Sequence, residues 1–394
     1  MISGIVKVLF FFLIKILPKK KNLLVFGDRA GLRFADNSRH LFLYLNKYKN
    51  KYRCIWITKD RKIIEFLNKN NFEAYKQNSL KGIYFCLVAN WHLYNFVEDD
   101  ISSKITLYSK SILLWHGVLP KKVNEIKHRE NFINNFIFKK IEKYFVYPNK
   151  ELAETFLNRF PAYKYTHLQS NLPRNLILEN KLSCIHSESE KDLINKIETS
   201  KKKVFGYFPT WREDGVEIFR DLKSNEQLEK LNFILKKNKS LLILKKHMNS
   251  EKKDGDRRYN PQIEKIINFL KEKDSIIIAD YDVDLNSILS KCDYLITDYS
   301  GVVFDYLYLN RPIIFYVPDY DEFKRNNGFE VNVIEKNIGQ IAKNIDELGT
   351  IISELSKNNS ENFIKLQNME ILRKKIFNPS NNGIENIIKI IERT

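Results

Sequence analysis

The chain has 394 residues, of which 43% are hydrophobic and 29% are charged, a composition typical of globular rather than disordered proteins. Its 66 basic and 48 acidic residues give a net charge of +18, so its surface attracts polyanions such as nucleic acid, anionic lipid or phosphate-rich substrates. No apolar run reaches the roughly 20 residues that span a bilayer, and no zinc-finger or aromatic-basic RNA-binding pattern occurs, so we expect no nucleic-acid partner.

The first 21 residues, MISGIVKVLFFFLIKILPKKK, combine a short apolar segment with a basic end. Lys7 and Lys15 interrupt the apolar part and no small-residue cleavage site follows, which argues against a signal peptide. An interfacial helix with Lys19, Lys20 and Lys21 on anionic headgroups fits this pattern, and a terminal helix packed on its own protein is the alternative. We therefore expect peripheral attachment at the cytoplasmic face of the cell membrane.

From residue 22 onwards, short apolar runs typical of strands alternate with segments of helical periodicity. The expected elements are strands at 23–26, 54–58, near 72, 112–115, 145–147 and 166–169, and helices at 39–48 and 62–69. Such alternation predicts a parallel sheet covered by helices. We assign residues 22–180 to an N-terminal Rossmann-like domain.

Residues 181–203 are polar and charged and are expected to form a hinge or linker that contains a helix, after which the alternation begins again. The expected strands are 204–208, 241–244, 275–279, 294–297 and 312–317, and the expected helices are 225–236, 261–271 and 285–290. Residues 204–333 are thus a second Rossmann-like domain, and residues 334–394 are expected to be mostly helical without a further strand. The predicted fold is α/β, with two doubly wound domains facing across a cleft in a GT-B-like arrangement.

One segment, residues 293–305 (DYLITDYSGVVFD), combines the features of a strand, a turn and a helix. Residues 294–297 are a short β-branched apolar run, and residues 302–309 carry apolar side chains at helical spacing. The free N–H groups of the helix N-terminus would then point off the end of the sheet as an anion site, with Ser300 as N-cap. An ordinary turn whose serine only caps the helix is the alternative.

His116 lies in LLWHGVLPKK, directly after an expected strand, with Gly117 beside it and Lys121 and Lys122 close behind. A histidine at a strand end near cations is suited to act as a general base, because its pKa lies close to the operating pH. A structural histidine bonded to the backbone is the alternative.

His247 also follows an expected strand, in LLILKKHMN, with Lys245 and Lys246 before it. Lysine beside histidine suits contact with a phosphate, where the cation stabilises charge on a leaving group. A solvated basic loop is the alternative. His116 and His247 occupy equivalent places in opposite halves of the chain.

Two arginines also follow expected strands. In PTWR at 209–212, Arg212 is placed to grip a pyrophosphate with two hydrogen bonds, and Thr210 to donate a hydroxyl hydrogen bond. Arg174, in PRN at 173–175, lies near the linker.

Several enzyme classes are disfavoured by missing motifs. No GxGxxG, Walker, HExxH or GxSxG motif occurs, which counts against dehydrogenases, P-loop enzymes, zinc proteases and serine hydrolases. The four cysteines are far apart without a CxxC pair, so free thiols in a reducing, cytoplasmic setting are expected rather than disulfides or metal ligands.

These segments together resemble the CDP-glycerol glycerophosphotransferase family, the polymerases and primases of teichoic acids and related capsules. The matching segments, which cover roughly residues 23–325, are WHG at 115–117, PTWR at 209–212, KKH at 245–247, ITDYSGVVFDYLYLNRPIIFY at 296–316 and, more weakly, DNSR at 36–39 and LPRN at 172–175.

The resemblance implies that His116 and His247 are catalytic and that the C-terminal domain binds the CDP donor, leaving the N-terminal domain on the acceptor side. The candidate donor-binding residues are Thr210, Arg212, Lys246, Thr297, Asp298, Ser300 and Gly301, and further candidates are Gly117, Arg174 and Asp305.

Three departures from the family pattern leave the alditol and the acceptor open. The family usually has a second serine where Gly301 stands and commonly a proline where Met248 stands. Its Pro-Gly-Pro segment after the last strand is missing, with only Ile-Gly-Gln at 338–340 in that neighbourhood.

The sequence thus predicts an enzyme that transfers glycerol phosphate, or a related alditol phosphate, from a CDP donor to the hydroxyl of a lipid-linked or polysaccharide acceptor and releases CMP. Its cations can stand in for a metal, so no metal site and no cofactor are expected, with Mg²⁺ as an aid that is not required. A GT-B sugar-nucleotide glycosyltransferase and a non-catalytic, membrane-bound nucleotide-binding scaffold are the alternatives.

Overall fold

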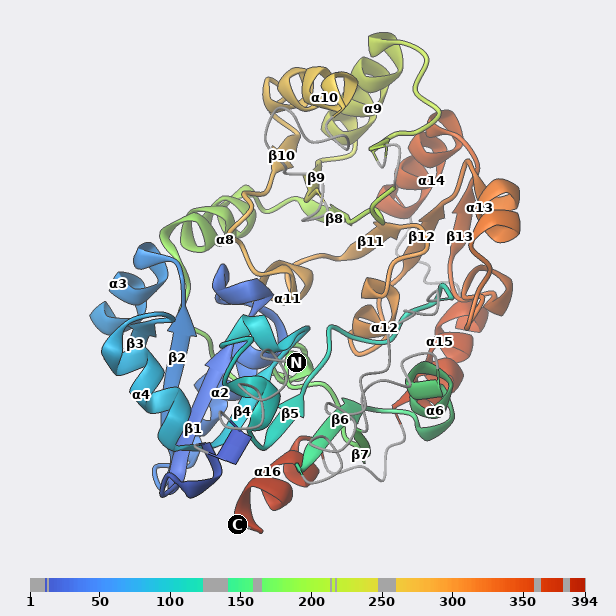
Figure 1. Ribbon diagram of the computed structural model, residues 1–394. Helices are drawn as coiled ribbons and strands as arrows, with labels where there is room; N and C mark the ends of the chain where they lie inside the picture. Colours follow the sequence, from blue (N-terminus) through green and yellow to red (C-terminus); the bar gives the residue numbers. More distant parts are fainter. Residues whose placement is uncertain are drawn as a thin grey trace. The chain divides into compact units, whose positions relative to one another are not determined.

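The computed structural model describes residues 11–12, 14–122, 141–158, 165–212, 215–216, 218–246, 260–357, 363–377 and 383–393. Its contacts divide the chain into two compact units. Unit 1 comprises Met1–Gly117, Val123–Ile185 and Lys375–Thr394, and unit 2 comprises Val118–Lys122 and His186–Lys374. Each unit contains one parallel sheet with helices around it (Figure 1), so the prediction of an α/β fold with two parallel sheets is confirmed.

The sheet of unit 1 has seven parallel strands in the order β3-β2-β1-β4-β5-β6-β7. They are β1 (Lys20–Gly27), β2 (Arg53–Thr58), β3 (Glu73–Lys76), β4 (Ala89–Tyr94), β5 (Ser111–Leu113), β6 (Lys143–Tyr147) and β7 (Thr166–Gln169). The helices are α2 (Asp36–Tyr48), α3 (Arg61–Lys69), α4 (Leu80–Val88), α6 (Lys150–Asn158), α7 (Asn175–Leu178) and α16 (Glu385–Glu392), with short 3₁₀ turns η1 (Arg29–Gly31), η2 (Glu98–Asp100) and η3 (Thr106–Tyr108). The strand order reverses between β1 and β4, which is where ligands bind in open α/β sheets.

Strand β4, which was not predicted, lies in the middle of this sheet beside β1. Its sequence, ANWHLY, carries two polar residues that break an apolar pattern, yet every residue of the strand is buried. The structure supplies their partners. The ring nitrogens of His92 lie 2.9 Å from Thr106 Oγ1 and 3.0 Å from the Cys86 carbonyl, and burial lowers the pKa of His92 to about 3. The amide of Asn90 donates to the Lys21 carbonyl at 3.2 Å.

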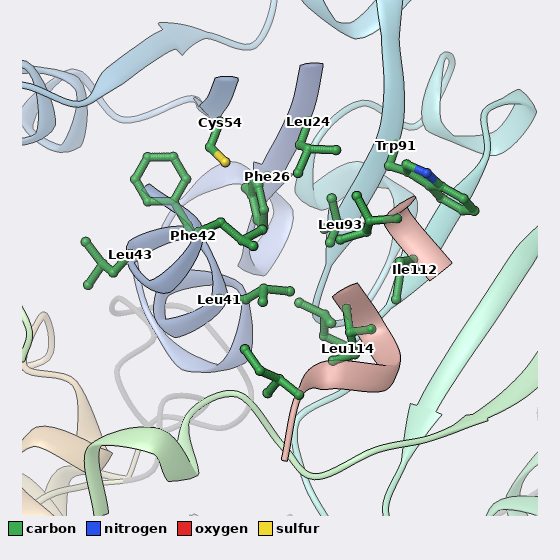
Figure 2. Packing of buried hydrophobic residues seen from close by; sticks show 14 of the residues in the cluster. Leu24, Phe26, Leu41, Phe42, Leu43, Cys54, Trp91, Leu93, Ile112 and Leu114 are labelled. Carbon is green, nitrogen blue, oxygen red and sulfur yellow. The ribbon is translucent and has the colours of Figure 1, made fainter. Parts of the chain in front are cut away.

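The core of unit 1 lies between its sheet and α2. Figure 2 shows Leu41 and Phe42 of α2 beside Phe26 of β1 and Leu93 of β4, all completely buried. The rings of Phe26 and Phe42 meet edge to face with their centroids 5.5 Å apart. This packing holds the first turn of α2 close to the ends of β1 and β4, where the polar residues of the site lie.

The sheet of unit 2 has six parallel strands in the order β10-β9-β8-β11-β12-β13. They are β8 (Lys203–Tyr207), β9 (Ser240–Leu244), β10 (Ile276–Ile278), β11 (Tyr294–Thr297), β12 (Ile313–Tyr316) and β13 (Gln340–Ala342). The helices are α8 (Glu188–Ser200), α9 (Asn225–Lys237), α10 (Pro261–Lys271), α11 (Leu285–Leu289), α12 (Val302–Tyr306), α13 (Tyr320–Asn326), α14 (Ile345–Lys357) and α15 (Phe363–Ile376), which runs over the boundary between the units, with a 3₁₀ turn η5 (Ile334–Lys336). Here the strand order reverses between β8 and β11.

Unit 2 also contains a short piece of chain that follows Gly117. Within this piece the Pro120 carbonyl accepts from the N–H groups of Glu330 and Val331 at 2.7 and 3.1 Å. Lys121 pairs with Phe329 in an isolated antiparallel bridge. The chain therefore leaves unit 1 one residue after His116.

Unit 2 begins inside the expected linker and includes most of the C-terminal segment that was expected to be helical. The expected linker, residues 181–203, contains α8, whose Leu193 and Ile197 are buried one helical turn apart. At the C-terminus, residues 334–394, expected to be mostly helical without a further strand, include the edge strand β13, which at three residues is too short to show a pattern. Beyond it, the red helix α16 lies beside β7 of unit 1 (Figure 1), with Ile387 and Ile391 in the unit 1 core.

The N-terminal segment differs from the expected interfacial helix in the part that the structure describes. Lys20 and Lys21 begin strand β1 instead of ending a helix. Phe11 and Ile14 are buried, and the Phe11 ring lies 6.3 Å from that of Tyr108, which matches the alternative of packing on the protein itself. Lys7 lies outside the described residues. Among the helices described, none is long and apolar enough to cross a membrane.

Candidate active site

His116 follows β5 in unit 1, at the edge of the sheet where the strands end. The residues on either side of it have left-handed backbone angles, with φ of 58° at Trp115 and 115° at Gly117. For a bulky residue such as tryptophan this conformation costs about 1–3 kcal/mol, and it persists only where the surroundings impose it. The ring of Trp115 lies 4.0 Å from the imidazole of His116 and also packs on Phe96, 5.7 Å away.

Arg174 holds the backbone of this histidine. Its Nη1 donates to the His116 carbonyl at 2.8 Å and to Asp36 Oδ1 at 2.9 Å. Gly117 has a further reason to be glycine, because a Cβ there would overlap the Arg174 guanidinium. The three candidates His116, Gly117 and Arg174 are thus brought together, and Asp36 joins them.

Three carboxylates lie near the point where the strand order of unit 1 reverses. Asp28 follows β1 and accepts from the Asn95 amide at 2.8 Å, while Asp100 accepts from the N–H groups of Phe96 and Ala30 at 2.7 Å. Burial, and then the nearby charges of Asp36 and Asp100, raise the pKa of Asp28 well above its ordinary value. Neither Asp28 nor Asn95 was predicted as a site residue. Asp28 follows an expected strand, a signal that could have found it, whereas Asn95 follows β4, which was not predicted.

In unit 2, Asp298 links the ends of the two strands between which the strand order reverses. It follows β11, and its Oδ1 accepts from the Thr210 hydroxyl at 2.6 Å and the Thr210 N–H at 2.8 Å, just beyond β8. Its own loop adds the N–H of Tyr299 at 2.7 Å. Asp298 and Thr210, both predicted as donor-binding residues, therefore contact each other.

Arg212 completes this arrangement. Its Nη2 donates to Asp298 Oδ2 at 2.9 Å, its Nε to Asp319 Oδ2 at 3.1 Å and its Nη1 to the Thr210 carbonyl at 3.0 Å. The guanidinium also lies 5.0 Å from the ring centre of Tyr299. Burial opposes its charge, but Asp298 and Asp319 outweigh burial and raise the pKa of Arg212. Asp319 was not predicted, although it follows an expected strand.

Two predicted donor-binding residues have other roles in the described structure. The Thr297 hydroxyl is buried in the sheet and donates to the Phe208 carbonyl at 2.7 Å. At Gly301, a Cβ would stand 2.5 Å from the Val118 carbonyl, so glycine here permits the close approach of another backbone segment of unit 2.

The turn before α12 differs from the predicted cap. The helix is five residues long rather than eight, and its N-cap is Gly301 rather than Ser300. Ser300 Oγ accepts from the Val302 N–H at a long 3.4 Å. Because a helix this short has a small dipole, the predicted anion site at its N-terminus loses much of its basis. Asp305 is buried within the same helix.

The candidates Lys246 and His247 follow β9. Lys246 donates to Glu264 at 3.1 Å, and its side chain is mostly buried. Its neighbour Lys245 donates to the Asp280 carbonyl at 2.6 Å. The predicted catalytic residue His247 and the departure Met248 lie outside the described residues. Within the described part of the chain, no three His, Cys, Asp or Glu side chains are grouped to hold a metal ion.

Comparison with known proteins gives one consistent answer. A model of the CDP-Glycerol:Poly(glycerophosphate) glycerophosphotransferase family matches residues 9–383. The chain is 29% identical over 338 residues to the teichoic acid poly(glycerol phosphate) polymerase of Bacillus spizizenii, covering 80% of this chain and 79% of that protein. It is 27% identical over 372 residues to the teichoic acid glycerol-phosphate transferase of Staphylococcus aureus, covering 88% of both. A solved structure of the wall teichoic acid polymerase TagF has the same fold, with a TM-score of 0.68 at 23% identity over 98% of this chain and 92% of that one.

Because folding raises the pKa of Asp28, we expect Asp28→Asn to increase the stability of the protein by an amount that depends on pH. A carboxyl whose pKa is raised by folding binds its proton more tightly in the folded chain, so it lowers stability increasingly as the pH rises above its ordinary pKa of 3.8. We expect the variant to melt at a higher temperature than the wild type near about pH 7.5, with a difference that shrinks toward about pH 4. Thermal melts across this range would measure it. Asp99→Asn, at an exposed carboxylate in η2, is the control; a lower melting temperature for Asp28→Asn at neutral pH would contradict the prediction.

Arg212→Met should destabilise the protein by about 3–5 kcal/mol, because it removes the cation from the buried Asp298 and leaves Asp319 with the longer ion-pair contact to Arg220 at 3.6 Å. Chemical denaturation would measure the loss. The same exchange at the exposed Arg53–Glu73 pair should cost less than about 1 kcal/mol. Equal costs at the two sites would show that Arg212 does not hold the strand ends together.

Proposed function

The chain belongs to the CDP-Glycerol:Poly(glycerophosphate) glycerophosphotransferase family, and from that premise we propose how its own residues carry out the reaction and where they do so. The enzyme is a transferase that moves glycerol phosphate from CDP-glycerol in teichoic acid synthesis. The family match over residues 9–383 carries this conclusion. For the acceptor we propose the terminal hydroxyl of a lipid-linked or polysaccharide chain; capsular polymers and other CDP-alditols stay predictions.

In the proposed mechanism His116 is the general base. The acceptor hydroxyl attacks the phosphorus on the glycerol side of the diphosphate in line, the bond from that phosphorus to the bridging oxygen breaks, and CMP leaves with the bond's electrons. The hydroxyl proton passes to the imidazole of His116. The strained, tightly bonded loop around His116 supports this role, because such strain is concentrated at functional sites.

For the leaving CMP we propose stabilisation by Lys246 and His247, which follow β9. Arg212 is proposed to act beside them at the end of β8. Its hydrogen bonds to Asp298, Asp319 and the Thr210 carbonyl use three of the five N–H groups of the guanidinium, which leaves two N–H groups for a contact with the diphosphate. Ser300, with its side chain partly exposed on the neighbouring turn, is a further donor contact in this proposal.

His116→Ala should lower CMP release by about 100- to 10,000-fold, because general-base catalysis contributes on that order. Donor affinity, measured by titration calorimetry with CDP-glycerol, should stay nearly unchanged, since the proposed base acts on the acceptor. CMP release would be measured with CDP-glycerol, CDP-ribitol and sugar nucleotides as donors and a lipid-linked acceptor.

His167→Ala is the matched control, because His167 lies in β7 and bonds to the Tyr147 carbonyl at 3.0 Å. Unchanged turnover in His116→Ala would remove His116 from the mechanism. CMP from CDP-ribitol alone would correct the alditol, and turnover of sugar nucleotides alone would favour the glycosyltransferase alternative.

We also propose that unit 1 rests on an anionic membrane surface at the cytoplasmic face of the cell. Helix α4 exposes Leu80, Ile83 and Tyr84, at positions i, i+3 and i+4 of one face, with Leu80 89% exposed. The end of the N-terminal segment lies beside this helix, since Lys19 donates to the Leu87 carbonyl at 2.5 Å and the Lys20 ammonium lies 5.4 Å from the Tyr84 ring centre. We call Leu80, Ile83, Tyr84 and Lys20 the α4 patch.

Charge supports a lipid surface as the partner of the α4 patch. Residues 1–27 and 74–97 contain lysines and no acidic residue. Apolar side chains beside lysines bind the boundary between anionic headgroups and acyl chains. The four cysteines are free and three are buried, which supports a reducing compartment on the same side of the membrane.

Leu80→Ser with Ile83→Ser should lower binding to phosphatidylglycerol vesicles by about 30-fold, because the two buried side chains contribute on the order of 1 kcal/mol each. Co-sedimentation would measure it, with phosphatidylcholine vesicles showing weak binding of both proteins. Ile364→Ser with Ile371→Ser, at side chains 62% and 65% exposed on α15, is the matched control. Equal losses in the two double variants would remove the α4 patch from the proposal.

A further inference from the structure

The loop that carries His116 is held by residues from two segments far away in the sequence. Arg174 Nη1 bonds at once to the His116 carbonyl and to Asp36 Oδ1, the first residue of α2. The Arg174–Asp36 pair is largely buried, with side-chain exposures of 8% and 18%. The guanidinium therefore connects the start of α2 to the backbone of the proposed base.

Asn37, the next residue of α2, makes a second connection to the same loop. Its Nδ2 donates to the Trp115 carbonyl at 2.8 Å, and its Oδ1 accepts from the N–H of Arg174 at 3.0 Å. The Asn37 side chain thus fixes the Trp115 carbonyl and the Arg174 side chain fixes the His116 carbonyl, and Asn37 also accepts from the backbone of Arg174.

The backbone conformation shows why these connections are needed. Asp36, Trp115 and Gly117 all have left-handed φ angles, of 57°, 58° and 115°. Such angles in non-glycine residues persist only where the surrounding contacts impose them. Two of the three residues are bonded to the Arg174 guanidinium or leave room for it, since a Cβ on Gly117 would overlap that group.

We propose that Asp36, acting through Arg174, is a positioning residue for His116. The ion pair fixes the direction of the His116 backbone, and thereby the place of its imidazole. This inference rests on the proposed role of His116 as general base. An ion pair that served stability alone would need no bond to the carbonyl of that one histidine.

The first test is kinetic. Arg174→Met and Asp36→Asn should each lower kcat for CMP release from CDP-glycerol by about 10- to 100-fold, because small misplacements of a reacting group cost this much. The KM for CDP-glycerol should stay within about twofold, since neither residue is placed on the donor. The double variant should be no slower than the slower single variant, because both residues act through one contact. Arg174→Lys, which keeps the charge, should have a kcat between those of Arg174→Met and the wild type.

Arg311→Met is the matched control. Arg311 also fixes two backbone carbonyls, those of Ser290 and Cys292 at 3.0 and 2.7 Å. It precedes β12, however, whereas the site residues of unit 2 follow their strands. It should lose stability without losing kcat per folded molecule. All rates are taken relative to the folded fraction measured by thermal melting.

A second measurement needs no turnover. In protein labelled at its histidine rings, the NMR signal assigned to His116 by its loss in His116→Ala should shift in Arg174→Met and stay in place in Arg311→Met. An unmoved signal, a kcat per folded molecule equal to wild type, or a rise in KM at unchanged kcat would each overturn the positioning role. Unchanged turnover in His116→Ala would instead overturn the proposed role of His116 as base. The NMR signal would still test separately whether Arg174 positions the His116 ring.

Discussion

A buried charge at the end of a parallel strand must find partners inside the protein, and this constraint shapes the candidate site in both units. In unit 1 Arg174 meets Asp36 and the His116 carbonyl; in unit 2 Arg212 meets Asp298 and the Thr210 carbonyl. In each case one guanidinium joins a carboxylate to the main chain of a loop that follows a strand. The planar, multiply donating head of arginine suits this task, whereas a lysine ammonium would hold the same atoms with less directional control.

The two arginines, Arg174 and Arg212, differ in how they can contribute to the reaction. Arg174 bonds to the carbonyl of the proposed base, so its influence on the imidazole passes through the backbone of His116. Arg212 is paired with two carboxylates, Asp298 and Asp319, so its positive charge is already balanced before any donor arrives. We therefore expect the proposed phosphate contacts in unit 2 to depend on cations that are less heavily neutralised, such as Lys246, which bonds to Glu264.

Two positions in the site are glycine because another group of the protein lies too close for a Cβ. Gly117 makes room for the Arg174 guanidinium and Gly301 for the Val118 carbonyl. The second of these contacts ties the turn before α12 to the piece of chain that begins directly after Gly117. The glycine at 301, a departure from the family's usual serine, is thus matched to the packing of its own chain, which accounts for it without reference to the substrate.

The sequence by itself determined the alternation of strands and helices, and β7, α10 and β11 begin and end where the local pattern placed them. It also placed His116 and Thr210 at strand ends, because they follow apolar runs, whereas Gly117 and Asp298 were candidates through the resemblance to the family. Only the tertiary structure decided the partners: Arg174 meets Asp36 across 138 residues and Arg212 meets Asp319 across 107. It likewise made β4 a central strand and returned α16 to the core of unit 1. Periodicity depends on near neighbours in the chain, whereas these contacts depend on the order of strands in a sheet, which no local pattern records.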